Sequence, residues 1–365
     1  MLLKSKKTYK KLKVNYSKKP ENKIRDYGLG ILKTYLSLLV IATHFFSRNT
    51  TKNEIILTLY DNRYIHVPSF FIMSFYFTCH NLLSLDPKKI INRFFKLLIP
   101  YIGWPIIILY INRKYNQKFI TKYNRKFNKK LPDSIEELKS QLYWGFQYMR
   151  QFWFQWDLIA TTLLFVLIIF IFRKNCLFVL QLLLILFYYF QYTGNYFKEY
   201  LKPKSNNIGT IMRMFEMIPL GVTGFTLGYF NVIKKLNKYK LQTLIISYII
   251  FHVVNNYQLF RKINGFQYQG IDLNIKSICI IFIFSLFPSD KITNIYYQKV
   301  FNLLTNYSAG PFYLHISMYK YCNNYIDEIK NKTFLGVVYN FLICYSISVL
   351  GDLILGKTPL KYLFC

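Results

Sequence analysis

The sequence predicts an all-α integral membrane protein, a bundle of about ten transmembrane helices. Two observations predict this fold class. Charged residues make up 18% of the 365-residue chain, below the roughly 25% usual in soluble proteins, and apolar residues make up 53%. The apolar residues also gather in runs long enough to cross a bilayer, and polar segments separate these runs.

Taken in order, the chain begins with residues 1–28, a tail with ten Lys and Arg residues. We predict this tail to be cytosolic, because positive charge next to the first helix favours that side. The ten predicted helices span residues 29–46, 69–85, 94–111, 152–172, 176–191, 211–230, 241–254, 275–287, 309–325 and 334–355. A long polar loop, residues 112–150, lies inside the membrane domain of residues 29–355, and a short tail, 356–365, ends the chain.

The net charge of +32 lies mostly in the segments between apolar runs. That placement is typical of membrane-protein loops beside anionic lipid, so we expect the lipid bilayer as a partner and no nucleic acid. The six cysteines include no Cys-x-x-Cys pair, and no two histidines are three or four residues apart. We therefore expect no disulfide framework, no metal site and no permanently bound cofactor.

Two polar residues interrupt the first apolar run, Lys33 near its start and His44 near its end. Eleven residues are almost three helical turns, so both side chains point to one side of the helix, about 16 Å apart along the axis. Ionisable groups inside a membrane are costly and usually functional. The alternative is that Lys33 extends to the headgroups and His44 is satisfied near the other end.

A second cationic pair, Arg93 and Lys96, lies at the predicted entry to the third helix. Residues three apart share a helix face, and Arg suits phosphate because its guanidinium makes two parallel hydrogen bonds. The alternative is that the excess of positive charge in cytosolic loops explains both residues.

Five segments, in this order, make the chain similar to the acyltransferase 3 family of integral membrane O-acyltransferases, closest to its short sugar-acetylating branch. The first is the cation and histidine of the first helix. The second, HVPSFFIMSFYF (66–77), resembles the family's His-Met-Pro-Leu-Phe-Phe segment, which ends in Ser-Gly-Tyr. The other three are RFFKLLIPYIGWPII (93–107), FWFQWDLI (152–159) and GPFYLHISM (310–318).

The resemblance implies transfer of an acyl group, commonly acetyl, from acyl-CoA to a hydroxyl of a sugar, glycan or glycolipid. His44 would be the general base, because a sugar hydroxyl is a poor nucleophile and histidine titrates near neutral pH. The cations Lys33, Arg93 and Lys96 would hold the phosphates of the donor. The acceptor side would be formed by His66, Trp153, Trp156, Asp157 and His315.

These acceptor-side residues also have simpler explanations. The two tryptophans and Asp157 could lie at the membrane interface, and His315 could pack against the first helix. His80 and His252 match no family segment, and we expect structural roles for them.

The chain departs from the family pattern at three positions. Lys96 replaces the second arginine of the family's Arg-x-x-Arg, which keeps the charge but loses one planar guanidinium. Gly30 replaces an acidic residue, although Asp26 lies one turn earlier, and Phe75 replaces the glycine of the Ser-Gly pair. These departures leave open a divergent substrate or reduced activity. Two rival functions are a transporter or flippase of a lipid-linked sugar, and an inactive relative with a structural role.

Overall fold

The computed structural model describes residues 26–45, 63–115, 153–193, 206–257, 271–322, 325–330 and 333–363, and within these ranges it contains helices and no strand. The all-α prediction is therefore confirmed. The main helices are α2 Tyr27–Phe45, α4 His66–Leu83, α5 Pro87–Tyr115, α8 Trp153–Phe172, α9 Cys176–Thr193, α11 Asn206–Tyr229, α13 Lys240–Tyr257, α14 Ile271–Ser285, α15 Ile295–Asn306, α16 Ala309–Cys322 and α18 Phe334–Leu355. Two short helices, α12 Val232–Leu236 and α17 Asp327–Lys330, and five 3-10 turns join them: η1 Arg63–Ile65, η3 Arg173–Asn175, η4 Asn237–Tyr239, η5 Ser289–Lys291 and η6 Pro359–Leu363.

Each of the ten predicted segments falls on one of these helices. By length and composition, three stretches of the described residues can cross a membrane: Pro87–Ile107, Trp153–Tyr189 and Phe334–Leu355. The count of ten spans stays a prediction. Most of the basic tail and of the long polar loop lies outside the described residues.

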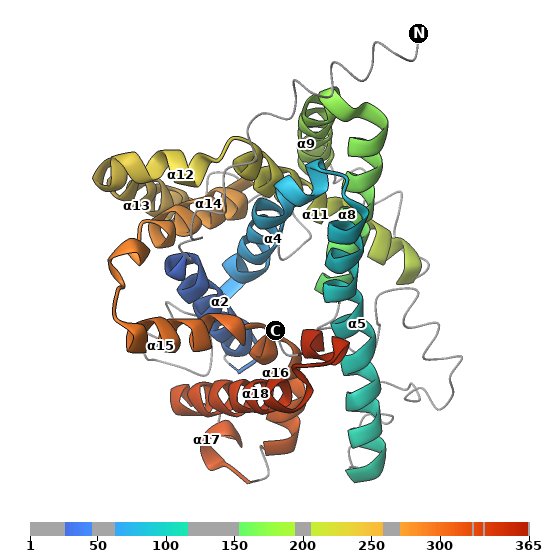
Figure 1. Ribbon diagram of the computed structural model, residues 1–365, viewed down its shortest axis with the longest axis vertical. Coiled ribbons are helices and arrows are strands. Elements are labelled where there is room, and N and C mark those ends of the chain that lie inside the picture. The colour runs from blue at the N-terminus through green and yellow to red at the C-terminus, as the bar shows by residue number, and fades with distance from the viewer. Residues whose placement is uncertain are drawn as a thin grey trace.

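The helices α2 and α4 lie near the middle of the molecule, with α5 and α8 stacked along one side and α16 and α18 at the bottom of the view (Figure 1). The helix α2 contacts α4, α14, α15, α16 and α18. Asp26 caps its start by accepting a hydrogen bond from the Leu29 backbone N–H at 3.0 Å. This is a favourable use of a carboxylate, because the first backbone N–H groups of a helix have no partner within it.

The helices α2 and α16 run side by side in the same direction. Ser37 donates a hydrogen bond to the Ser308 carbonyl at 2.5 Å, across 271 residues of sequence. His44 and His315 are also 271 residues apart (315 − 44), and their rings are in contact. The two pairs are seven residues apart along both segments. The two helices therefore keep one register over about two turns.

Glycines of α11 allow a close approach to α4. A Cβ at Gly224 would overlap the carbonyl of Ile72, and one at Gly228 would lie 2.7 Å from the carbonyl oxygen of Tyr76. A third glycine, Gly221, faces Phe75, whose ring would be 3.3 Å from an added Cβ. Small residues at such spacing are how membrane helices bring their backbones together.

The helix α5 begins earlier than predicted. The basic link before residue 94 is helical from Pro87, because proline fits the first turn and the Asp86 carboxylate accepts from the Lys88 N–H at 3.0 Å. Arg93 therefore lies almost two turns inside a helix and not at its entry. Near it, the C-terminal turn η6 packs on α5, where Trp104 Nε1 donates to the Leu363 carbonyl at 2.7 Å.

One of the main helices is missing from the prediction. The helix α15 is twelve residues long, too short to cross a membrane, and it packs against α2. Thr34 donates to the Leu304 carbonyl at 2.9 Å, and a Cβ at Gly30 would overlap the methyl group of Thr305. The glycine at position 30 is thus explained by packing, since a carboxylate side chain there would displace α15.

Candidate active site

Three histidines from three helices gather where α2 ends and α4 begins. His44 is exposed, whereas His66 and His315 are 3% and 1% exposed. The ring centres of His44 and His315 are 5.0 Å apart, with the ring planes inclined by 35°. His315 also interacts electrostatically with both of the other histidines. The ring of His44 therefore faces another helix of the bundle.

The hydrogen bonds of His315 fix its tautomer. Its Nδ1 lies 3.0 Å from the Pro311 carbonyl oxygen and 2.9 Å from that of Phe312. Both partners are acceptors, so Nδ1 carries the proton and Nε2 keeps a lone pair. This Nε2 is buried and has no hydrogen-bond partner among the residues that the structure describes. The ring thus presents an unused acceptor within the histidine group.

A second polar group lies deeper among α4, α5, α8 and α16. Arg93 donates to Ser74 Oγ at 2.5 Å, and its Nε is buried without a hydrogen-bond partner in the described part of the chain. Tyr313 is within electrostatic range of Arg93 and donates to Gln155 Oε1 at 2.9 Å. Gln155 in turn donates to the Leu97 carbonyl at 3.2 Å. The guanidinium therefore has a spare N–H inside the bundle, where an anionic or carbonyl oxygen would satisfy it.

Lys33 approaches the same part of α4 from the side of α2. Its Nζ lies 5.0 Å from the centre of the Phe77 ring, and it interacts electrostatically with Asp26. Phe77 follows Ser74 by three residues, so the two share a face of α4. Lys33 and Arg93 are thus two cations held against one helix.

Lys96 is separated from this pair. Its side chain is exposed, and its Nζ lies 5.8 Å from the Tyr362 ring of η6. The same tyrosine donates to Asn92 Oδ1 at 2.9 Å. The expectation that Arg93 and Lys96 act as neighbours on one face is therefore not met: Arg93 is turned inward, and Lys96 covers the C-terminal turn.

Comparison with known proteins decides the family. The model of the acyltransferase domain that defines the acyltransferase 3 family matches residues 26–352, which include the three histidines, Lys33 and Arg93. The chain belongs to this family. No curated protein and no solved structure matches it. Family membership makes the protein a membrane O-acyltransferase.

The departures at positions 30 and 75 from the pattern of acyltransferase 3 proteins have structural counterparts here. Asp26, one turn before Gly30, interacts electrostatically with Lys33, as an acid at position 30 would be placed to do. Phe75 is fully buried, and its ring centre is 4.7 Å from that of Phe165. The glycine lost at position 75 is matched by Gly221 on the facing helix.

The remaining predicted residues of this acyltransferase 3 protein lie on α8. Asp157 is fully buried and has interactions, so it does not lie at an exposed interface. Trp156 stands 6.0 Å from Tyr101 between ring centres, and Trp153 stands 6.1 Å from Phe154. Both tryptophans are half-buried at the start of the helix. The contact of Trp156 joins α8 to α5, and part of each tryptophan ring stays accessible.

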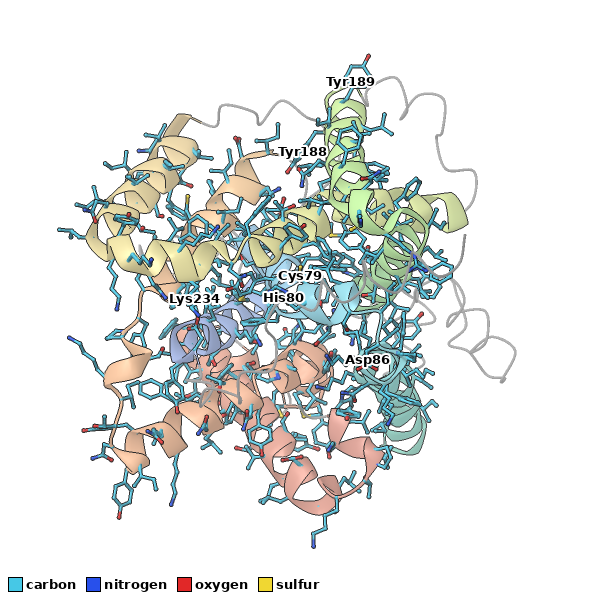
Figure 2. The ribbon with its side chains drawn as sticks, turned by 45° about the horizontal axis from the view of Figure 1, so that its top comes forward. Cys79, His80, Asp86, Tyr188, Tyr189 and Lys234 are labelled. Atoms are coloured by element: carbon cyan, nitrogen blue, oxygen red, sulfur yellow. The ribbon has the colours of Figure 1, made fainter. Side chains whose placement is uncertain are left out.

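His80 lies away from the histidine group. It follows His66 by fourteen residues in one helix, which is about 21 Å along the axis. Figure 2 shows it beside Cys79, and its Nε2 is 3.3 Å from Asn231 Oδ1 at the turn before α12. His252 is exposed and contacts Tyr248, with ring centres 4.4 Å apart. In the part of the chain that the structure describes, no three His, Cys, Asp or Glu side chains are grouped to hold a metal ion.

The sequence analysis did not single out several residues of the deeper group. Ser74, Gln155 and Tyr313 lie in the family-like segments 66–77, 152–159 and 310–318, and only the packing of α4, α8 and α16 brings them to Arg93. Asn340 of α18 is a further example, because its amide donates to the His315 carbonyl at 3.2 Å. A polar residue in an apolar run was the available signal.

Proposed function

We propose that this protein transfers an acyl group, in the first instance acetyl, from acyl-CoA to a hydroxyl of a sugar, glycan or glycolipid, with His44 as general base. The observation that carries the proposal is the position of the His44 ring. It is reachable from outside and at the same time lies against the buried ring of His315. A base must reach its substrate and be held in place, and His44 meets both conditions.

The proposed reaction is direct transfer. His44 takes the proton of the acceptor hydroxyl while the hydroxyl oxygen attacks the thioester carbonyl carbon. The C–S bond then breaks, and His44 gives the proton to the departing CoA sulfur. Acyl-CoA is thus a donor substrate, and the protein itself holds no acyl group.

The donor is proposed to lie between the cations and His44. Acyl-CoA carries several phosphate charges, and Lys33 and Arg93 approach one face of α4 from two sides. The eleven residues from Lys33 to His44 span about 16 Å of continuous helix, room for an extended arm that joins phosphates to a thioester. Lys96 is the weakest of the three donor contacts, since its side chain lies on Tyr362.

The acceptor is proposed to approach from the side of the bundle where α4 and α8 begin. His66 opens α4, Trp153 and Trp156 open α8, and Asp157 follows them. Aromatic rings and a carboxylate are groups that bind sugars, by stacking and by hydrogen bonds to hydroxyls. We further propose ten membrane spans with a cytosolic N-terminus, which would bring Lys33 and the donor phosphates to the cytosolic side.

The test compares cells that produce the wild-type protein with cells that produce His44→Ala. Mass spectrometry of surface and lipid-linked glycans should detect acetyl esters only with the wild-type protein. His252→Ala is the matched control, because it removes an exposed histidine far along the chain and should leave the esters unchanged. Equal esterification by wild type and His44→Ala would reject His44 as the base, and no ester with any of the proteins would reject the carbohydrate acceptor.

A further inference from the structure

We propose that His315 is the positioning residue of the base: its Nε2 accepts a hydrogen bond from a ring N–H of His44 and so fixes the tautomer of His44. This inference rests on the proposed function and assigns His315 a role other than acceptor binding. It starts from an unusual feature, a fully buried ring nitrogen without a partner. Leaving such an acceptor unsatisfied costs about 1–3 kcal/mol, so a donor that reaches it on binding would be favoured.

The tautomer of His315 decides which of the two histidines donates the hydrogen bond between them. Its Nδ1–H is held by the carbonyls of Pro311 and Phe312, so its Nε2 can act only as an acceptor. Of the two histidines that interact with it, His44 has its ring centre 5.0 Å away, with the ring planes inclined by 35°. A donated N–H from one nitrogen of His44 leaves the other nitrogen with its lone pair for the acceptor hydroxyl.

The backbone keeps the two rings in place. The Ser37 bond to the Ser308 carbonyl sets the register of α2 against α16, and the histidines follow each serine by seven residues. On its other side, α16 is tied to α18 by the bond from Asn340 to the His315 carbonyl. The arrangement needs only a rotation of the exposed His44 ring, which is common when a catalytic hydrogen bond tightens on substrate binding.

His315 exchanges no proton in this role. The hydroxyl proton moves to His44 and then to the CoA sulfur, and the N–H that His44 donates to His315 stays on His44. The role corresponds to that of a residue that orients a catalytic histidine and makes the resulting imidazolium less costly. His66 is the competing donor, because it also interacts with His315.

The test is a double-mutant cycle on purified protein in lipid nanodiscs, with radiolabelled acetyl-CoA and a panel of octyl glycosides as acceptors. His315→Leu should lower kcat roughly 10- to 100-fold with the KM for acetyl-CoA unchanged, since only the transition state loses a contact. In a His44→Ala background the same change should have no further effect. His315→Gln, whose amide oxygen can replace the acceptor, should recover part of the rate.

Ser348→Ala is the matched control for packing, because Ser348 of α18 lies against Gly310 of α16, the helix that carries His315. It should leave kcat unchanged. A kcat for His315→Leu equal to wild type, or a further loss of rate in the His44→Ala background, would overturn the positioning role. If His315→Leu does not fold, His315→Gln decides alone: a wild-type KM with lower kcat supports the role, and a raised KM for the glycoside alone overturns it. Absence of transfer by the wild-type protein would overturn the proposed function and this inference with it.

Discussion

Ser37 of α2 donates a hydrogen bond to the carbonyl of Ser308 at the start of α16, seven residues before a histidine on each side. Both serines are buried, so the bond is protected from competing partners. It fixes the register of α2 against α16, and the rings of His44 and His315 are in contact two turns further on. The geometry of the site thus depends on a contact about 10 Å away from it.

Ser37→Ala should therefore affect both stability and rate. Loss of one interhelical hydrogen bond should lower the free energy of unfolding by about 1 kcal/mol, and a looser register should lower kcat severalfold. Thr162→Ala is the control, since the Thr162 hydroxyl donates within α8, to the Leu158 carbonyl at 2.6 Å. Thermal unfolding and acetyl transfer measure the two effects. A wild-type rate in Ser37→Ala would show that the register is set elsewhere.

Arg93 and Lys96 should separate in their effect on the donor. Arg93→Gln removes a half-buried charge-assisted donor worth about 1.5–3 kcal/mol and should raise the KM for acetyl-CoA roughly 10- to 100-fold. Lys96→Gln should leave that KM nearly unchanged, because the side chain is exposed and lies on Tyr362. Steady-state kinetics with varied acetyl-CoA tests both variants. An effect of Arg93→Gln on the acceptor KM alone would place Arg93 outside the donor site.

Gly224→Ala should be poorly tolerated. The added Cβ would overlap the Ile72 backbone, which cannot move without separating α11 from α4. Gly103→Ala is the control, because there the Cβ would meet only the end of the Leu363 side chain, which can rotate away. The yield of monodisperse protein should fall strongly for Gly224→Ala and little for Gly103→Ala. Equal yields would mean that α4 and α11 approach less closely.

Phe75→Gly, which restores the family's Ser-Gly pair, should destabilise this protein. The Phe75 ring is fully buried against Phe71 and Phe165, with ring centres 5.5 and 4.7 Å away. Deleting a buried aromatic ring leaves a cavity and costs about 3–5 kcal/mol. Phe75→Leu, which keeps most of the volume, should cost less. Greater stability in Phe75→Gly would indicate that the packing around Gly221 is not the compensation that we infer.

Much of the fold follows from the sequence because the apolar runs of a membrane protein are long and separate. The segments predicted as helices all fall on helices, and Lys33 and His44 share one continuous α2 as expected. The main miss, α15, has too few residues to stand out as a span. Its amphipathic pattern is the one signal that the sequence offers, and it is easily taken for a polar loop.

The site was harder to predict because it is assembled from contacts between distant segments. The pairing of Arg93 with Ser74 depends on how α4 packs on α5, and the spacing of Arg93 and Lys96 gave no hint that they point apart. Because α5 starts at Pro87, Arg93 lies inside a helix and not just before one, as predicted. By contrast, the pairing of His44 with His315 was within reach, since both lie in family segments.

The distance in sequence between His44 and His315 bears on when the histidine pair can form during synthesis. The two histidines are separated by 271 residues of sequence (315 − 44), as are Ser37 and Ser308. At a ribosomal rate of about 5–20 residues per second, the second histidine emerges roughly 14–54 s after the first. Until then the His44 ring lacks its contact with α16, and a chain truncated before α16 would contain the proposed base without its neighbour.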